Sequence, residues 1–338
     1  MKLWIKHGVA TRVAMLRKAH TALGIDQVAI EKDWWVTMVL KALFECSCSK
    51  HLIFKGGTSL SKGWNLIERF SEDIDLSINH EFFGIEKTNK SQREKLRKTA
   101  RRYIFDVLSS ELVVNLMAMG VNNFHVENVT EIIDKNGERK SIDSDKDPTV
   151  ILVHYDSVLK NSIDYIPTAV KIEISCLSMN EPTESRLISS YIEQTFPGED
   201  DGATSYVRTV LPTRTFLEKA FLLCEELQKQ KPRHVRMSRH LYDLEKMMDT
   251  TFGREALADS ELYQKIVYHR SVYYAVGYVD YSKLQPSVIN FIPQEELLDD
   301  WKNDYAEMRT HFIYGESLPF NELLKRMHEL QDRFRSMK

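Results

Sequence analysis

A glycine pair at the end of an apolar run, followed by two aspartates one residue apart, is the feature that most limits what this chain can fold into. Residues 54–78 read FKGGTSLSKGWNLIERFSEDIDLSI. The apolar start predicts a short strand, and the glycines predict a tight turn into a helix over residues 58–68. Alternating residues then predict a second strand over residues 73–78, with both aspartates on one face. The stretch therefore predicts a helix packed against two strands of a sheet.

The aspartates and the turn together indicate phosphate chemistry. Asp73 and Asp75 point to the same side of an extended segment, and two carboxylates held that close repel each other unless a cation lies between them. The turn at Gly56 and Gly57 leads into a helix whose first N–H groups can bind a phosphate. A phosphate-binding turn beside a metal-binding pair is typical of phosphoryl- or nucleotidyl-transfer enzymes.

Each part also has a simpler interpretation when it is taken alone. The aspartates could be solvated carboxylates at a strand end, and the turn could be an ordinary helix start with Thr58 or Ser59 as its N-cap. The whole spacing, GG[T/S]xL followed after one helix by DxD, is more specific than either part. It matches neither GxxxxGK[ST] nor GxGxxG, so these two common nucleotide-binding loops are excluded.

Size and composition indicate a globular protein of more than one domain in a reducing cytoplasm. At 338 residues the chain is longer than one typical core, and its net charge of −3 argues against a protein that coats nucleic acid. The cysteines Cys46, Cys48, Cys176 and Cys224 show neither an ordinary disulfide spacing nor a zinc spacing. No apolar run approaches the ~18–20 residues needed to span a bilayer, so no membrane association is expected.

The apolar pattern changes along the chain from mixed to helical. It predicts helices over residues 8–22, 27–46 and 91–119, and β-rich segments between residues 124 and 175. Residues 196–205, FPGEDDGATS, combine proline, glycine and acidic residues and predict a linker. After it, helical spacing covers residues 213–229, 236–249, 255–270, 293–312 and 319–337. The sequence therefore predicts an α+β domain over residues 1–205, with helices at its N-terminus, and a helical domain over residues 206–338.

A third carboxylate is expected near the aspartate pair, because two on one strand rarely complete a two-metal site. In the segment AVKIEIS, Lys171, Glu173 and Ser175 alternate with apolar residues and share one face. Glu173 is therefore the candidate, and the alternative is the solvated face of an antiparallel sheet.

Two charged groups in the C-terminal half have weaker arguments of their own. Lys219 lies in an apolar helical run, where it is either functional or a lysine that reaches out to water along its stem. Arg239 and Asp243 are spaced i, i+4, so they either serve a site or form a plain intrahelical ion pair. Basic residues between positions 229 and 239 would attract a polyanion such as RNA, or they form a polar loop between helices.

Four segments together resemble a known family. FKGGTSLSK…RFSEDIDL resembles the nucleotidyltransferase signature of the DNA polymerase β-like superfamily, and more narrowly that of the AbiEii/AbiGii-type toxin nucleotidyltransferases. TFLEKAF at 215–221 resembles the lysine motif of that family and SRHLYDL at 238–244 its Arg/Asp motif, while EKDWWV at 31–36 is similar but less diagnostic. The resemblance implies a polymerase β-like domain with a mixed or antiparallel sheet, followed by an α-helical domain that closes the active-site cleft.

The resemblance also implies roles for individual residues. Gly56, Gly57, Thr58 and Ser59 would hold the triphosphate of an NTP substrate, and Asp73 and Asp75, with Glu173, would bind Mg²⁺ or Mn²⁺. Lys219 would reach the phosphates, Asp243 would be a catalytic or nucleotide-positioning carboxylate, and Arg239 would contact the nucleotide beside it.

The implied activity is transfer of an NMP to an acceptor. The family favours RNA, and transfer RNA in particular, with the protein acting as the toxin of a toxin–antitoxin or phage-defence system and a cognate antitoxin protein as its partner. Two alternatives remain open. One is a protein nucleotidylyltransferase of the AMPylator kind, and the other is a catalytically silent binding module on the same fold.

Overall fold

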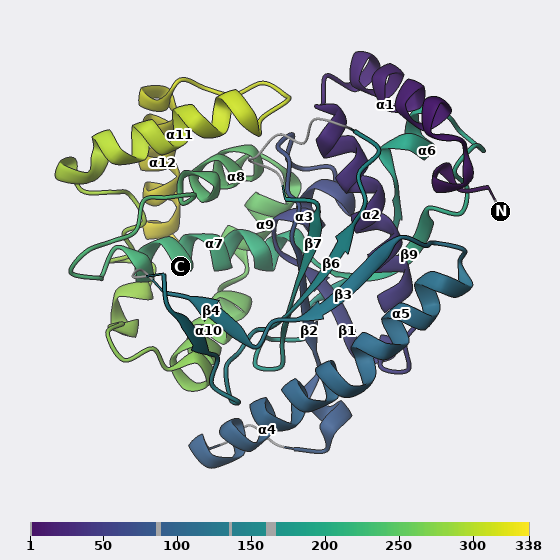
Figure 1. Cartoon of the computed structure of the whole chain (residues 1–338). Coiled ribbons are helices and arrows are strands. Elements are labelled where there is room, and N and C mark those ends of the chain that lie inside the picture. The colour runs from purple at the N-terminus through teal and green to yellow at the C-terminus, as the bar shows by residue number, and fades with distance from the viewer. Residues whose placement is uncertain (1, 86–88, 135–136, 160–166, 338) are drawn as a thin grey trace. The chain divides into compact units, whose positions relative to one another are not determined.

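The computed structural model describes residues 2–85, 89–134, 137–159 and 167–337 (Figure 1). Its contacts divide the chain into two compact units. The first unit contains Met1–Gly63 and Ser71–Thr209, and the second contains Trp64–Phe70 and Val210–Lys338. The short segment 64–70, between the glycine turn and the aspartate pair, thus belongs with the C-terminal half of the chain.

A seven-stranded mixed sheet forms the centre of the first unit (Figure 1). β2 pairs in parallel with β7 and antiparallel with β1, β1 pairs in parallel with β9, and β6 pairs antiparallel with both β7 and β3. The prediction of an α+β fold with a mixed sheet is therefore confirmed. In sheet order the strands are β3 (Phe124–Asn128), β6 (Thr149–Tyr155), β7 (Ala169–Ser175), β2 (Ile74–Ile78), β1 (Leu52–Lys55), β9 (Thr204–Val210) and β8 (Thr183–Ser189).

Helix α2 (Gln27–Leu43) is the core helix of this unit. Nearly every residue from Val28 to Ala42 is buried, and the helix contacts β7 and three neighbouring helices. Because this helix is apolar around most of its circumference, it is enclosed on all sides. Its helical neighbours are α1 (Val9–Leu23), α5 (Ser109–Ala118) and α6 (Tyr191–Thr195).

The predicted helix over residues 91–119 is present as one continuous run. It consists of α4 (Lys90–Tyr103), a π-helical turn (Ile104–Leu108) and α5. A small separate hairpin is formed by β4 (Glu131–Ile133) and β5 (Arg139–Ser141). Short 3-10 helices complete the unit at Trp4–Lys6, Ser49–His51 and His80–Phe83.

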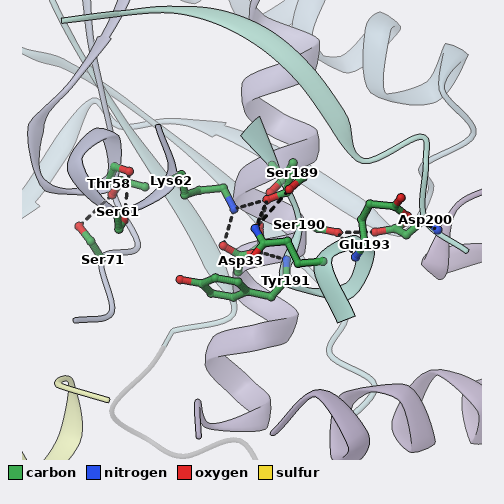
Figure 2. Close-up of polar contacts among 12 residues, drawn as sticks. Asp33, Thr58, Ser61, Lys62, Ser71, Ser189, Ser190, Tyr191, Glu193 and Asp200 are labelled. Atoms are coloured by element: carbon green, nitrogen blue, oxygen red, sulfur yellow. Dashed lines mark hydrogen bonds and ion pairs between the residues drawn. The ribbon is translucent and has the colours of Figure 1, made fainter. Parts of the chain in front are cut away.

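Two predicted boundaries in this unit are wrong. The helix after the glycine turn, α3, spans Gly56–Lys62 and does not continue to residue 68, because Gly63 ends it and Asn65 takes a left-handed φ of 52°. Residues 196–205 are no linker, because they form tight turns that lead into β9 of the same sheet. Asp200 in these turns is fully buried and accepts a hydrogen bond from Ser190 (Figure 2). It also accepts one from the Trp34 indole.

The second unit is helical, as predicted. The expected helix over residues 255–270 is divided at Asp259, whose side chain accepts a hydrogen bond from Leu262 N–H and caps the second helix. The elements of the second unit are α7 (Pro212–Glu226), α8 (Ser238–Met248), α9 (Thr251–Ala258), α10 (Ser260–His269), a π-helical turn (Arg270–Tyr274), 3-10 helices (Tyr281–Leu284, Glu295–Leu297), α11 (Leu298–His311) and α12 (Phe320–Arg335).

Backbone hydrogen bonds fix the segment 64–70 within this helical unit. Phe70 N–H donates to Phe312 O at 2.7 Å, and Tyr314 N–H donates to Glu68 O at 3.1 Å. Arg69 and Ile313 form an isolated antiparallel bridge between these contacts. Across the described part of the chain, no helix has the length and apolar character that a membrane crossing requires.

Candidate functional site

The two aspartates lie where the alternation predicts them. Asp73 precedes β2 and Asp75 is its second residue, and both are half-buried, whereas Ile74 and Leu76 between and after them are fully buried in the core. Period-2 alternation explains this pattern, because successive side chains of a strand point to opposite faces of the sheet. The apolar residues therefore anchor the strand and leave both carboxylates on its other face.

The glycine turn lies directly against one of these carboxylates. Gly56 has a left-handed φ of +78°, and a Cβ built on it would be 2.0 Å from Asp75 Oδ2. Lys55, the residue before it, is the register partner of Asp75 in the antiparallel pair of β1 and β2. Only glycine meets both demands at position 56, because it has neither a Cβ to clash nor a penalty for this backbone conformation. The turn and the aspartate pair thus form one local site.

Thr58 and Ser59 have buried hydroxyls that bind the backbone of the site itself. Thr58 Oγ1 donates to Asp73 O at 2.5 Å. The same Oγ1 lies 2.9 Å from Ser71 Oγ (Figure 2). Ser59 Oγ donates to Gly56 O at 2.8 Å. The Thr58 bonds fasten the first turn of α3 to the segment that carries the aspartates, and the Ser59 bond lies within that turn. A role for Thr58 and Ser59 in holding a triphosphate stays a prediction, and it rests on their backbone N–H groups.

Glu173 is the register neighbour of Asp75 in the parallel pair of β2 and β7, so the two side chains share a face of the sheet. Glu173 forms an ion pair with Lys171 two residues earlier on the same strand. Burial lowers the pKa of Lys171, but the hydrogen bond and charge of Glu173 and the charges of Asp73 and Asp75 outweigh burial and raise it. The three carboxylates therefore already attract one cation, the Lys171 ammonium.

The donor set fits a hard divalent cation such as Mg²⁺. Oxygen ligands are the ones that Mg²⁺ prefers, and it often takes only one or two protein carboxylates and completes its shell with phosphates and water. Among the described residues, no group of three or more His, Cys, Asp or Glu side chains is placed to hold a metal ion. The structure thus offers Asp73 and Asp75 as the pair, and a ligand role for Glu173 stays a prediction.

A second set of predicted residues comes together inside the helical unit. Lys219 of α7 places its Nζ 2.7 Å from Asp243 Oδ2 on α8, and Asp243 is completely buried. Arg69 donates two hydrogen bonds of 2.7 Å to the same carboxylate, from Nε to Oδ1 and from Nη2 to Oδ2. Such a bidentate pair is the strongest form of the Arg–carboxylate contact. Asp243 is therefore held by side chains from two elements other than its own helix.

Burial and the charges of neighbouring residues set the pKa values of Asp243 and Lys219. Burial alone would raise the pKa of Asp243, but the charges and hydrogen bonds of Arg69 and Lys219 hold it below its ordinary value. Burial lowers the pKa of Lys219, and the charges of Arg69 and Arg239 lower it further, so the Asp243 charge only partly restores it. The cluster carries more positive than negative charge, which suits an anionic ligand.

His240 is a neutral member of the same surroundings. Burial and the nearby cations Lys219, Arg239, Arg69 and Arg233 lower the pKa of His240 well below its ordinary value. Its buried Nδ1 has no hydrogen-bond partner among the described residues. The neutral imidazole adds no charge to the cluster, so the cations determine the electrostatic potential there.

Sequence reasoning assigned no role to Arg69, Lys62 or Lys32, although all three stand in the motifs that it singled out. Arg69 begins RFSEDID and Lys62 ends GGTSLSK, so their proximity to the motif residues was the available signal. Their partners are distant in the chain and follow no local periodicity. Asp243, for example, lies 174 residues after Arg69.

Comparisons with known proteins give a matching family. A family model described as the nucleotidyl transferase AbiEii toxin of a type IV toxin–antitoxin system matches residues 39–326. Among solved structures, the chain is similar to MenT4, a nucleotidyltransferase toxin from Mycobacterium tuberculosis H37Rv. That similarity has a TM-score of 0.46 and 15% identity, and it covers 96% of this chain and 98% of that chain. No curated protein matches the sequence.

Proposed function

Because the chain belongs to the AbiEii family of nucleotidyl transferase toxins of type IV toxin–antitoxin systems, we propose that it transfers an NMP from an NTP to RNA, with transfer RNA as the favoured acceptor. The enzyme class follows from the family, whereas the acceptor, the metal and the residue roles are the proposal. In the reaction, an acceptor hydroxyl forms a bond to the α-phosphorus while the bond to pyrophosphate breaks, and the hydroxyl proton is lost.

The observation that carries the proposal is the contact between Gly56 and Asp75. The backbone of the turn lies so close to the Asp75 carboxylate that a Cβ on Gly56 would be 2.0 Å from its oxygen. Backbone N–H groups at a turn and carboxylates at a strand are the protein parts that phosphate transfer needs at one place. Their contact in a single unit supports a nucleotide triphosphate beside Asp73 and Asp75.

Within that site, the turn and the aspartate pair have different roles. Backbone N–H groups from Gly56 to Ser59 bind the triphosphate, and Asp73 and Asp75 hold Mg²⁺ or Mn²⁺. A bound divalent ion would neutralise phosphate charge and lower the pKa of the attacking hydroxyl. Fixed side chains and backbone dipoles cost no reorganisation during the transfer, which is why the rigid attachment of the turn to β2 matters.

The helical unit contributes its buried cations. Lys219 binds the phosphates as a point charge, because an ammonium carries three donors and the ion pair with Asp243 takes one of them. Asp243 orients that ammonium and is itself held by Arg69. Arg239 adds positive charge near Lys219. The helical domain, residues 206–338 in the predicted division, would close the cleft in this scheme.

Exposed basic residues support an RNA acceptor. Lys231, Arg233 and Arg236 are exposed in the segment just before α8, which carries Asp243. Lysine and arginine on a surface attract the phosphate backbone and make binding dependent on salt. A cognate antitoxin is implied by the family, and a cytoplasmic location and a role in phage defence stay predictions.

A labelling experiment tests the acceptor class. The purified protein is incubated with total RNA or total cell protein, each α-labelled NTP in turn, and Mg²⁺, Mn²⁺ or a chelator. We expect metal-dependent label on RNA of transfer-RNA size, with one NTP preferred. Label on protein would replace RNA with a protein hydroxyl as the acceptor, and no label in any combination would contradict the proposed transfer.

A further inference from the structure

Helix α2 carries three successive charged residues, Glu31, Lys32 and Asp33, that are all buried. Their exposed fractions are 1%, 2% and 5%. Successive residues on a helix point in different directions, so three of them cannot share one partner. Buried charges persist only where each is paired or accepts or donates hydrogen bonds. Each of the three indeed contacts a different segment of the first unit.

Asp33 binds the end of the helix that follows the glycine turn. Lys62, the last residue of α3, places its Nζ 2.5 Å from Asp33 Oδ1 and donates to Ser189 O at 3.0 Å (Figure 2). The other oxygen of Asp33 accepts a 2.9 Å bond from Tyr191 N–H. The Lys62 ammonium also lies 5.2 Å from the centre of the Tyr191 ring. The position of α3 is thus tied to α2 by a buried ion pair.

Lys32, the neighbour of Asp33, binds the segment that leads into the aspartate pair. Its Nζ lies 2.6 Å from Glu72 Oε2, and the side chains of both residues are buried. Glu72 directly precedes Asp73 in the chain. Two adjacent residues of one helix therefore hold the glycine-turn helix on one side and the residue before the first aspartate on the other.

A third contact closes these ties into a ring. Thr58 Oγ1 on α3 donates to Asp73 O at 2.5 Å, so α3 is joined directly to the residue after Glu72. Starting from Lys62, the ring passes through Asp33 and Lys32 to Glu72, and it returns through Asp73 and Thr58 to α3. A closed ring of contacts fixes the distances between its members better than any single contact does, because each contact limits the movement that the others allow.

We propose that Lys32 and Asp33 are positioning residues, which set the glycine turn against Asp73 and Asp75 through Glu72 and Lys62. This proposal rests on the proposed function, because it names what holds that site together. None of the four residues touches the nucleotide in this scheme. They act by fixing the two parts that do, the turn and the aspartate pair.

The energetics of buried ion pairs agree with a positioning role. Removing two charges from water costs about as much as their attraction returns, so such a pair adds little net stability. Two such pairs beside one another on α2 are therefore poorly explained by stability alone. A site that must hold reacting groups within a fraction of an ångström does explain them, because small misplacements slow a reaction strongly.

Four variants of the full chain test the proposal. Lys62→Met and Asp33→Asn each break the tie to α3 at nearly constant size, and the double variant D33N/K62M removes both charges. Glu31→Gln is the matched control, because Glu31 lies on the same helix, is equally buried and binds Ser157 and Val158 N–H instead of the site. The measurements are kcat and KM for NMP transfer, the Tm, and amide hydrogen exchange over residues 56–62 and 71–76.

We expect kcat/KM to fall about a hundredfold in K62M and D33N, mainly through kcat. In both variants, amide hydrogen exchange should become faster over residues 56–62 and 71–76. E31Q should keep the wild-type kcat/KM and exchange in those segments. The double variant should regain Tm relative to either single variant, since no buried charge is left unpaired, but not kcat. Recovery of kcat together with Tm, or an equal loss of kcat in E31Q, would overturn the proposal.

Hydrogen exchange separates this proposal from the proposed function. If the wild-type protein transfers no NMP, the proposed function fails, and exchange alone decides the positioning role. Faster exchange in both segments of K62M, with no change in E31Q, supports the ring. Unchanged exchange in K62M overturns it, whatever the activity of the wild-type protein.

Discussion

Arg69 donates two hydrogen bonds of 2.7 Å to the carboxylate of Asp243, although the two residues are 174 positions apart in the chain. Asp243 is completely buried and Arg69 nearly so, and Lys219 binds the same carboxylate. Arg69 also stands four residues before Asp73 in the sequence. The bond therefore joins the segment between the turn and the aspartate pair to the carboxylate that family resemblance singled out.

Loss of this contact should destabilise the protein strongly. In Arg69→Met, Asp243 loses both hydrogen bonds from Arg69, and breaking one side of a buried pair costs about 3–5 kcal/mol. The free energy of unfolding, measured with denaturant, checks this change. Lys302→Met is the control, because Lys302 is an exposed cation of the same unit and its loss should leave that free energy nearly unchanged.

Lys219 should lose its charge at a lower pH than an ordinary lysine, because its pKa in the folded state is lowered by burial and by Arg69 and Arg239. Triphosphate affinity should therefore fall with rising pH before pH 10.5 is reached. Between the folded-state pKa and 10.5, the unfolded chain binds more protons, so the Lys219 contribution to stability rises over the same interval. A KM for the NTP and a Tm that both rise with pH over this interval are the expected signature.

Lys219→Arg provides the comparison for that profile. Arginine keeps its charge throughout this range, so the alkaline loss of NTP affinity should disappear in this variant. If NTP affinity falls at alkaline pH in Lys219→Arg as it does in the wild-type protein, the titrating group is not Lys219.

Gly56→Ala should abolish transfer because its methyl group would lie on Asp75. The matched control is Gly84→Ala, which has a comparable φ of +60° but nothing within 4 Å of the added Cβ. Both substitutions carry a left-handed backbone cost of about 1–2 kcal/mol, so both should lower Tm. Only Gly56→Ala should lose NTP binding, measured by calorimetry. Equal losses in both variants would show that backbone strain, and not the contact with Asp75, is responsible.

Glu173→Gln should affect transfer less than loss of either aspartate. Glu173 is paired with Lys171, and the described residues hold no three-carboxylate metal group, so we expect a loss of about tenfold or less. Asp75→Asn should lower kcat by about 10²–10³. Rates at saturating NTP and graded Mn²⁺ give the comparison, and an equal loss for both variants would make Glu173 a full member of the site.

Local patterns predicted the parts of the fold that depend on local periodicity. The aspartates at the start of β2, the glycine turn and most helices of the second unit follow from alternation and helical spacing, and the family match confirms the family that the motifs resemble. The polar edge strand β8 escaped prediction, because it lacks the alternation of a strand with one buried face.

The contacts that assemble the site could not be predicted from spacing. Spacing alone pointed from Asp243 to Arg239 one helical turn earlier, and it gave no sign of the contacts from Arg69 and Lys219 on other elements. The pairs of Lys32 with Glu72 and of Asp33 with Lys62 likewise depend on tertiary packing around α2. Such pairs follow from the fold, and a single sequence contains no signal for them.

One measurement tests the central claim most directly. Wild-type protein and Asp75→Asn are each given RNA, Mg²⁺ and the preferred NTP, labelled either at the α-phosphate or at the γ-phosphate. We predict that wild-type protein places only the α-label on RNA and releases the γ-label as pyrophosphate, and that Asp75→Asn does both more slowly by about 10²–10³. Transfer of the γ-label to RNA, or undiminished α-label transfer by Asp75→Asn, would contradict nucleotidyl transfer at the Gly56–Asp75 site.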